Sequence, residues 1–191
     1  MIYLLLASVV LAVLVTWLRG GKLSQLGKVV FRLWWVVPLI ATVQSLLIRL
    51  PHPPSRLDLW HPRPLLMIAS YVILWAVVWL NRHLPGMGVV LVGVSCNLLV
   101  IAANGGYMPL APESLERMQT GVSQIPLGNV LAGSKDVLLA RQQTPFWILG
   151  DVLVIPEPFP WPTAMSIGDV LLAVGVFLLI TNTTQAQNTG E

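Results

Sequence analysis

The sequence predicts an all-α membrane protein with about five transmembrane helices and a small extracytoplasmic cap that contains a short helix and extended segments. Three observations predict this fold class. Hydrophobic residues make up 55% of the 191 residues, charged residues make up only 10%, and the mean hydropathy is +0.77. Five segments are apolar enough to be helices that cross a bilayer. The long stretch 104–163, between the fourth and the fifth segment, instead has the composition of a small folded unit.

The composition excludes several classes of protein. A soluble domain carries roughly 25% charged residues, so a water-soluble enzyme or a disordered regulator is not expected. The 11 Lys and Arg residues exceed the 8 Asp and Glu residues only slightly and are scattered, so no nucleic-acid partner is expected. The single cysteine, Cys96, cannot form an internal disulfide. Membrane lipid is the expected environment, and another membrane protein is a candidate partner.

Crossing a hydrocarbon core of about 30 Å takes about 20 apolar residues. The five candidate segments run from Ile2 to Leu18, Val29 to Leu50, Leu65 to Leu80, Gly88 to Ala103 and Ile167 to Ile180. The last three are short, so their ends are expected to extend into flanking residues. Six tryptophans lie near predicted ends, where an amphipathic ring suits the headgroup layer: Trp17, Trp34, Trp35, Trp60, Trp79 and Trp161. The first segment lacks a preceding lysine or arginine and a cleavage site, which predicts a retained helix.

Three residues stand out among the polar residues of the second and fourth segments. Arg32 lies near a segment end, where its side chain can extend to the interface. Gln44 and Asn97 are expected to form hydrogen bonds between helices. A transport pathway would need an intramembrane carboxylate or a pair of broken helices in an internal repeat, and the sequence shows neither. Asp169, the only acid within a candidate segment, lies at its edge, so transport is not expected.

Charge placement predicts the orientation of a multi-pass protein in the cell membrane. Arg19, Lys22 and Lys28 all follow the first segment, so the positive-inside rule places the N-terminus and the 104–163 loop outside the cytoplasm. Arg56 and Arg63 in the second loop weaken this bias.

The sequence divides into residues 1–103 with four transmembrane helices, residues 104–163 as the cap, and residues 164–191 with the fifth helix and a short tail. In the cap, Ala111 to Met118 reads as a short helix with Pro112 in its first turn. Extended runs are expected at Asn129 to Leu131, Val137 to Leu139 and Phe146 to Ile155. The alternating prolines from Ile155 to Pro162 predict a stiff link down to the fifth helix.

Three motifs in order carry a resemblance to a known family. They are Asn104-Gly-Gly-Tyr-Met-Pro109, Leu149-Gly-Asp-Val-Leu-Val-Ile-Pro156 and Ser166-Ile-Gly-Asp-Val-Leu-Leu172. This set resembles a bacterial family of integral membrane proteins that is catalogued only as a domain of unknown function. The resemblance covers most of the chain and implies an intact membrane protein of about this size, and it implies no activity.

A second, local resemblance covers Met165 to Gly175, which is similar to the last motif of lipoprotein signal peptidases. It places Asp169 at the position of one of the two catalytic aspartates, with a proline-rich linker before it. Ser166 stands where the peptidase has asparagine. Asp151 follows Gly150 directly, so its spacing departs from that of the other catalytic aspartate, and the asparagine-x-x-aspartate-arginine motif is missing.

The two aspartates support two interpretations. As chemistry, Asp151 and Asp169 would be a catalytic pair that shares one proton, with Asn104 and Ser166 as substrate-binding residues. As structure, Ser166 and Asp169 form a capping box, Asp151 is a turn residue, and Asn104 with its two following glycines ends a helix. The geometric hypothesis is that Asp151 and Asp169 approach closely beside Asn104, under the cap.

His52, His61 and His83 form no metal signature, and no phosphate-binding loop follows a strand, so no metal and no cofactor are expected. The first functional hypothesis is a binding, accessory or scaffold protein of the membrane. The alternative is a membrane-embedded aspartyl hydrolase related to lipoprotein signal peptidase. Whether the protein is an enzyme stays open at this point.

Overall fold

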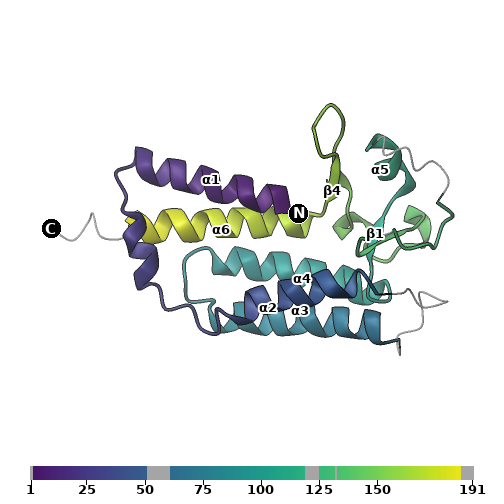
Figure 1. The fold of residues 1–191 in the computed structure, drawn as a ribbon, viewed down its shortest axis with the longest axis horizontal. Helices are drawn as coiled ribbons and strands as arrows, with labels where there is room; N and C mark the ends of the chain where they lie inside the picture. The colour runs from purple at the N-terminus through teal and green to yellow at the C-terminus, as the bar shows by residue number, and fades with distance from the viewer. Residues whose placement is uncertain (1, 51–60, 119–124, 132, 186–191) are drawn as a thin grey trace.

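The computed structural model describes residues 2–50, 61–118, 125–131 and 133–185. The described chain is mostly helical, as predicted. Five apolar helices lie side by side along one axis, with a cap at one end (Figure 1): α1 (Ile2–Leu18), α2 (Val36–Leu47), α3 (Pro62–Leu80), α4 (Met87–Ala103) and α6 (Ile167–Gln185). By length and composition, α3 and α6 could each cross a membrane, and the other three are shorter apolar helices.

Four of the five helices differ at their ends from the predicted segments. The largest difference is at α2, which begins at Val36 rather than Val29. Leu33 has a φ of +57°, a left-handed conformation that a helix cannot contain, so a turn precedes α2. Arg32 therefore lies outside the helix, and its backbone N–H donates to Asn81 Oδ1 at 2.7 Å. At the other end of the chain, α6 continues past Ile180 to Gln185.

The helices pack in the order α1, α6, α4, α3, α2. Each neighbouring pair is joined by a hydrogen bond between side chains. These bonds are Thr16 to Thr184 at 3.0 Å, Asn97 to Asp169 at 3.0 Å, Trp75 to Ser95 at 2.9 Å and Gln44 to Ser70 at 2.9 Å. The predicted interhelical hydrogen bonds of Gln44 and Asn97 are thus confirmed. Such bonds and small residues are typical of helices that associate without a large hydrophobic driving force.

The contact between α4 and α6 is made through glycines spaced seven residues apart on each side. A Cβ on Gly93 would lie 2.7 Å from the Gly168 carbonyl oxygen, and one on Gly168 would lie 2.8 Å from the Gly93 carbonyl oxygen. About two helical turns further along α6, a Cβ on Gly175 would lie 2.9 Å from the Gly86 carbonyl oxygen. Real Cβ atoms do not approach backbone this closely, so the two helix backbones can touch only because these positions are glycine.

The cap consists of short elements between α4 and α6. Strand β1 (Met108–Leu110) pairs in parallel with β2 (Asp136–Leu138), and α5 (Pro112–Arg117) follows β1. The predicted short helix is therefore confirmed, as is the extended run at Val137. The run predicted from Phe146 to Ile155 is wrong in its first part, because a 3-10 turn, η3 (Trp147–Leu149), precedes β3 (Leu153–Ile155).

The proline-rich segment also differs from its prediction. Strand β3 pairs antiparallel with β4 (Thr163–Met165), with Ile155 opposite Thr163. Residues 156–162 are therefore the loop of a hairpin, which projects from the cap beside the start of α1 (Figure 1), rather than a straight link to α6. Prolines suit this loop because proline has no backbone N–H, so it leaves no donor unsatisfied where the strand pairing ends.

The cap is joined to the helices by a shared core. Met108 is fully buried and packs in one cluster with Met67, Val100 and Ile101 of the helices. Tyr107 and Val137 are buried within the cap itself. Because β1 follows α4 after only a short turn, the end of α4 fixes where the cap sits.

We expect Gly93→Ala to lower the free energy of unfolding by about 1–3 kcal/mol, since the added methyl group overlaps the α6 backbone. Gly88→Ala is the matched control on the same helix, because a Cβ there meets nothing within 4 Å. The control should leave stability within about 1 kcal/mol of the wild type, on the stabilising side. Thermal or denaturant unfolding of both variants measures this difference, and equal effects would contradict the glycine contact.

Candidate functional site

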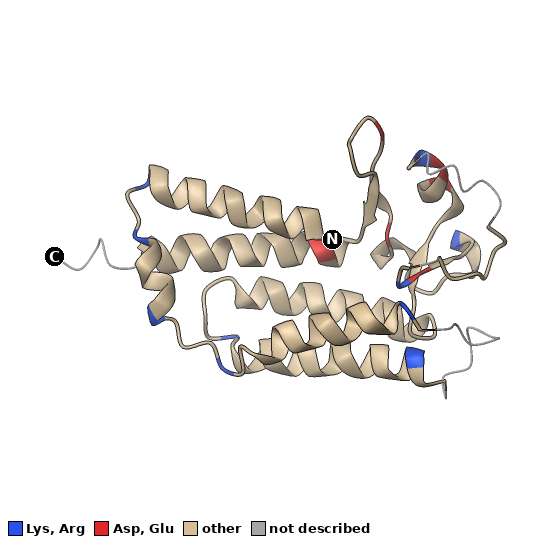
Figure 2. Cartoon of the chain, viewed as in Figure 1, with Lys and Arg blue, Asp and Glu red and all other residues tan. Residues whose placement is uncertain are grey.

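Two of the predicted site residues, Asp151 and Asp169, are buried where the cap meets the helices. Asp151 lies two residues before β3 and Asp169 lies in the first turn of α6, and their exposed fractions are 3% and 1%. Figure 2 shows the acidic residue at the start of α6 and the mixed charges of the cap beside it. Buried carboxylates need compensating partners, so the partners decide what these side chains can do.

Asp169 is held by a capping box and by α4. Its backbone N–H donates to Ser166 Oγ at 3.0 Å, and the Ser166 N–H donates to Asp169 Oδ2 at 3.4 Å. Asn97 Nδ2 donates to Asp169 Oδ1 at 3.0 Å, while Ser166 Oγ donates to Asn97 Oδ1 at 2.9 Å. The three side chains form a closed ring across the α4–α6 contact. Both carboxylate oxygens of Asp169 are therefore engaged by the protein.

Asp151 is held by the cap. Its backbone N–H donates to the Pro109 carbonyl at 3.0 Å, and its Oδ2 accepts a hydrogen bond from Lys135 Nζ at 3.3 Å. The same ammonium lies 3.5 Å from Asp136 Oδ1. The second oxygen of Asp151, Oδ1, is buried and has no hydrogen-bond partner among the described residues. Asp151 thus keeps one carboxylate oxygen that the surrounding protein does not use.

The charges of this cluster shift the protonation of its members. Burial raises the pKa of Asp151 to about 7; Lys135 opposes this shift, while the charges of Asp136 and Asp169 reinforce it. Burial alone would lower the pKa of Lys135, but the carboxylates of Asp151 and Asp136 outweigh burial and hold that pKa above its ordinary value. Lys135 therefore stays an ammonium, while Asp151 changes charge near neutral pH.

Asn104 lies at the end of α4 and has a structural role in this geometry. Its Nδ2 donates to the Val100 carbonyl at 2.8 Å and to the Pro145 carbonyl at 3.1 Å. Gly106 has a φ of +87°, and a Cβ there would overlap Pro64. The motif therefore ends a helix and fixes the segment at Pro145. Substrate binding by Asn104 and Ser166, and catalysis by Asp151 and Asp169, stay predictions.

Sequence reasoning missed the basic residues of the junction. The sequence did contain a signal that Lys135 is special. It is the single lysine after residue 28, and it stands beside Asp136 and before the apolar residues Val137 to Ala140. Arg63 is also buried, with 1% exposure. Its Nη2 donates to the Ser134 carbonyl at 3.1 Å, and its guanidinium lies 5.5 Å from the centre of the Tyr107 ring. Arg63 therefore links the start of α3 to the cap.

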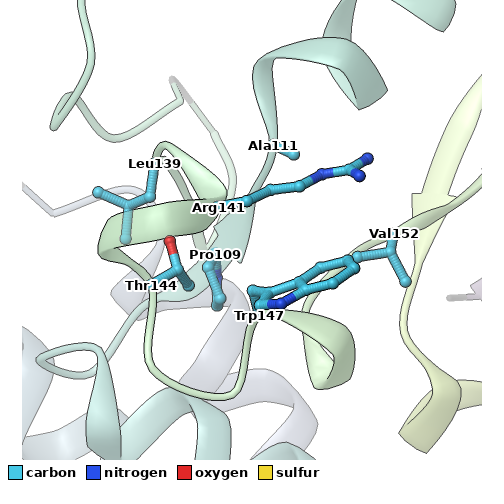
Figure 3. A pocket seen from close by; sticks show the side chains of 7 residues that line it. All are labelled: Pro109, Ala111, Leu139, Arg141, Thr144, Trp147 and Val152. Carbon is cyan, nitrogen blue, oxygen red and sulfur yellow. The ribbon is translucent and has the colours of Figure 1, made fainter.

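A shallow pocket lies in the cap, and neither aspartate lines it (Figure 3). Its lining residues are Pro109, Ala111, Leu139, Arg141, Thr144, Trp147 and Val152. The Arg141 guanidinium lies 5.0 Å from the centre of the Trp147 ring, along the edge of the pocket. Within the described ranges, no group of three His, Cys, Asp or Glu side chains could hold a metal ion.

The comparisons with known proteins identify the family. A family model described as "Family of unknown function (DUF5317)" matches residues 28–181. This range includes the whole junction cluster, which consists of Asn97, Lys135, Asp136, Asp151, Ser166 and Asp169. The chain belongs to this family. An uncharacterized protein of Thermotoga maritima is 25% identical over 127 residues, which cover 65% of this chain and 68% of the relative. No solved structure matches. The predicted membership of an uncharacterised family is therefore confirmed.

The Asp151 pKa gives a testable pH dependence. Because the folded-state pKa of about 7 lies above the ordinary value of 3.8, the folded chain holds this proton more tightly than the unfolded chain. The resulting stabilisation is fully present below about pH 4 and is lost as the pH rises through about 7. We expect Asp151→Asn to flatten the fall in Tm between about pH 5 and pH 8. Glu157→Gln, at an exposed acid of the hairpin, should leave the slope unchanged, and an unchanged slope in Asp151→Asn would contradict the assignment.

Proposed function

We propose that this member of the DUF5317 family is a five-helix integral membrane protein that acts by binding, with its N-terminus and its cap on the extracytoplasmic side. The observation that carries the membrane location is the apolar outer surface of the helices. Leu14 of α1, Ile73 of α3 and Val92 of α4 are 49%, 50% and 53% exposed, and many other large apolar side chains are exposed beside them. Polar groups instead pair between helices, which is the arrangement that a lipid environment favours.

The dimensions and the aromatic residues support the same proposal. The 17 residues of α1 and the 19 residues of α3 span about 25 Å and about 28 Å, close to the hydrocarbon thickness. Near the cap, Tyr3 stacks on Trp161 with ring centres 5.3 Å apart. At the other end of α3, the Arg82 guanidinium lies 4.4 Å from the centre of the Trp79 ring. Aromatic rings at both ends are typical of the two lipid–water interfaces.

The distribution of charge supports the orientation. At the end of the helices away from the cap, the described residues include five bases and no acid (Figure 2). The bases are Arg19, Lys22, Lys28, Arg32 and Arg82. The described acids all lie in the cap or at the start of α6, where bases accompany them. The positive-inside rule then favours a cytoplasmic position for the end away from the cap.

The junction cluster favours binding over hydrolysis. A two-aspartate hydrolase needs two carboxylates that share one proton and face a common water. Asp169 has both oxygens engaged by Asn97 and Ser166, and Asp151 is paired with Lys135. These partners stabilise the junction on which a binding surface of the cap would depend.

A hydrolase related to lipoprotein signal peptidase is the second candidate, and one observation favours it. The buried Oδ1 of Asp151 lacks a hydrogen-bond partner among the described residues, and burial places the pKa of that carboxyl near 7. A carboxyl with such a pKa can exchange a proton with a substrate at neutral pH.

Cysteine labelling tests the topology. In a Cys96→Ser background, we expect Gln142→Cys in the cap to react with an impermeant thiol reagent in intact cells. His83→Cys, between α3 and α4, should react only after lysis. Both positions are exposed in the structure, so accessibility within the protein is matched. The reverse pattern would overturn the orientation, and labelling of both positions in intact cells would overturn the membrane-spanning arrangement.

Substitution of the aspartates separates the two candidate functions. If the protein acts by binding, Asp169→Asn should lower stability by about 1–3 kcal/mol through loss of charge-assisted hydrogen bonds, and no membrane peptide should accumulate uncleaved in cells. If it is a hydrolase, Asp151→Asn and Asp169→Asn should both abolish processing of a membrane peptide while the proteins stay folded. Unfolding curves and peptide profiles of membranes that carry each variant distinguish these outcomes.

A further inference from the structure

We propose that the turn Pro145–Leu149 of the cap is a lipid-contact surface, whose outward side chains lie in the headgroup layer of the membrane. Three consecutive large side chains of this turn are exposed: Phe146 at 51%, Trp147 at 40% and Ile148 at 54%. An aqueous loop tip would not be expected to carry such a run. The inference rests on the proposed membrane location and adds that the cap itself enters the interface.

The structure fixes this turn at the level of the helix ends. Leu149 packs against the buried cluster formed by the ends of the helices, and η3 contacts both α4 and α6. The Asn104 amide at the end of α4 donates to the Pro145 carbonyl at 3.1 Å. The turn is therefore anchored at both of its ends to the cap end of the bundle, which is where the proposed lipid–water interface lies.

The backbone of the turn holds its side chains outward. Phe146 has a φ of +54°, a left-handed conformation that a bulky residue rarely adopts. A strained backbone of this kind is retained where the surrounding structure requires it, and it often marks a functional surface. Here it lets Leu149 face the core while Phe146 and Ile148 face away from it.

Lipid is the occupant that the surroundings favour. Leu99, near the cap end of α4, is 46% exposed, and η3 contacts α4, so the exposed apolar side chains of the helices extend to the end of the bundle that carries the turn. On the cap side of the turn, the Arg141 guanidinium covers the Trp147 ring (Figure 3). Exposed apolar side chains, an indole and a neighbouring cation form a combination that suits the lipid–water interface, where phosphate groups attract cations.

Depth-dependent quenching by nitroxide lipids tests this surface. In a Cys96→Ser background, single cysteines at Ile148, Val10 and Glu116 carry the same fluorophore in phosphatidylcholine nanodiscs. Val10 lies in the middle of α1 and is 57% exposed, and Glu116 is an exposed position on α5. We expect a headgroup nitroxide to quench the label at Ile148 several-fold more than the label at Glu116. A nitroxide deep in the acyl chain should quench the label at Val10 most.

The three label positions distinguish failure of the proposed membrane location from failure of the proposed lipid-contact surface. If the deep nitroxide leaves Val10 unquenched, the membrane location itself is wrong. If Val10 is quenched and Ile148 behaves like Glu116, the membrane location stands and the lipid-contact surface is wrong. A label at Ile148 that is shielded from aqueous iodide yet unquenched by every lipid would indicate a protein contact, such as a second copy, and would also overturn the proposal. The substitution Phe146→Asn removes the aromatic ring, and asparagine tolerates the left-handed backbone at this position. If the ring holds the turn in lipid, this substitution should reduce quenching of the Ile148 label by the headgroup nitroxide.

Discussion

The close approach of α4 and α6 is the contact on which the rest of the structure depends. Gly93 and Gly168 let the two backbones touch, and this contact brings Asn97 of α4 within hydrogen-bonding distance of Asp169. A larger residue at either glycine would move the helices apart and break the ring of Asn97, Ser166 and Asp169. Because the cap begins where α4 ends and finishes where α6 begins, the spacing of these helices also sets the spacing of the two ends of the cap.

The junction combines apolar packing with an unusual amount of buried charge. Arg63, Lys135, Asp151 and Asp169 are buried or nearly buried between the cap and the helices. Lys135 and Asp151 form an ion pair, and removing either partner would leave an uncompensated buried charge, which would destabilise the packing of the cap on the helices. Met108 and its apolar neighbours supply the packing between the cap and the helices.

The sequence predicted what depends on local pattern. The range of α1, the short helix α5 and the capping box of Ser166 and Asp169 follow from hydropathy and from residue types at fixed spacing. The ion pair of Lys135 and Asp151 did not, because it depends on the register of β1 with β2 and on a bridge between Leu110 and Asp151. The late start of α2 escaped prediction because a hydropathy profile does not detect a left-handed leucine.

The contrast between the two aspartates limits any chemistry at the junction. Asp169 accepts hydrogen bonds on both oxygens from groups that also hold α4 against α6, so freeing it for catalysis would loosen the helix contact. Asp151 has one oxygen paired with Lys135 and one oxygen without a partner among the described residues. Proton exchange at this junction would therefore be centred on Asp151, with the Lys135 ammonium beside it. An aspartate beside a lysine is a different arrangement from the two aspartates that share a proton in an aspartyl hydrolase.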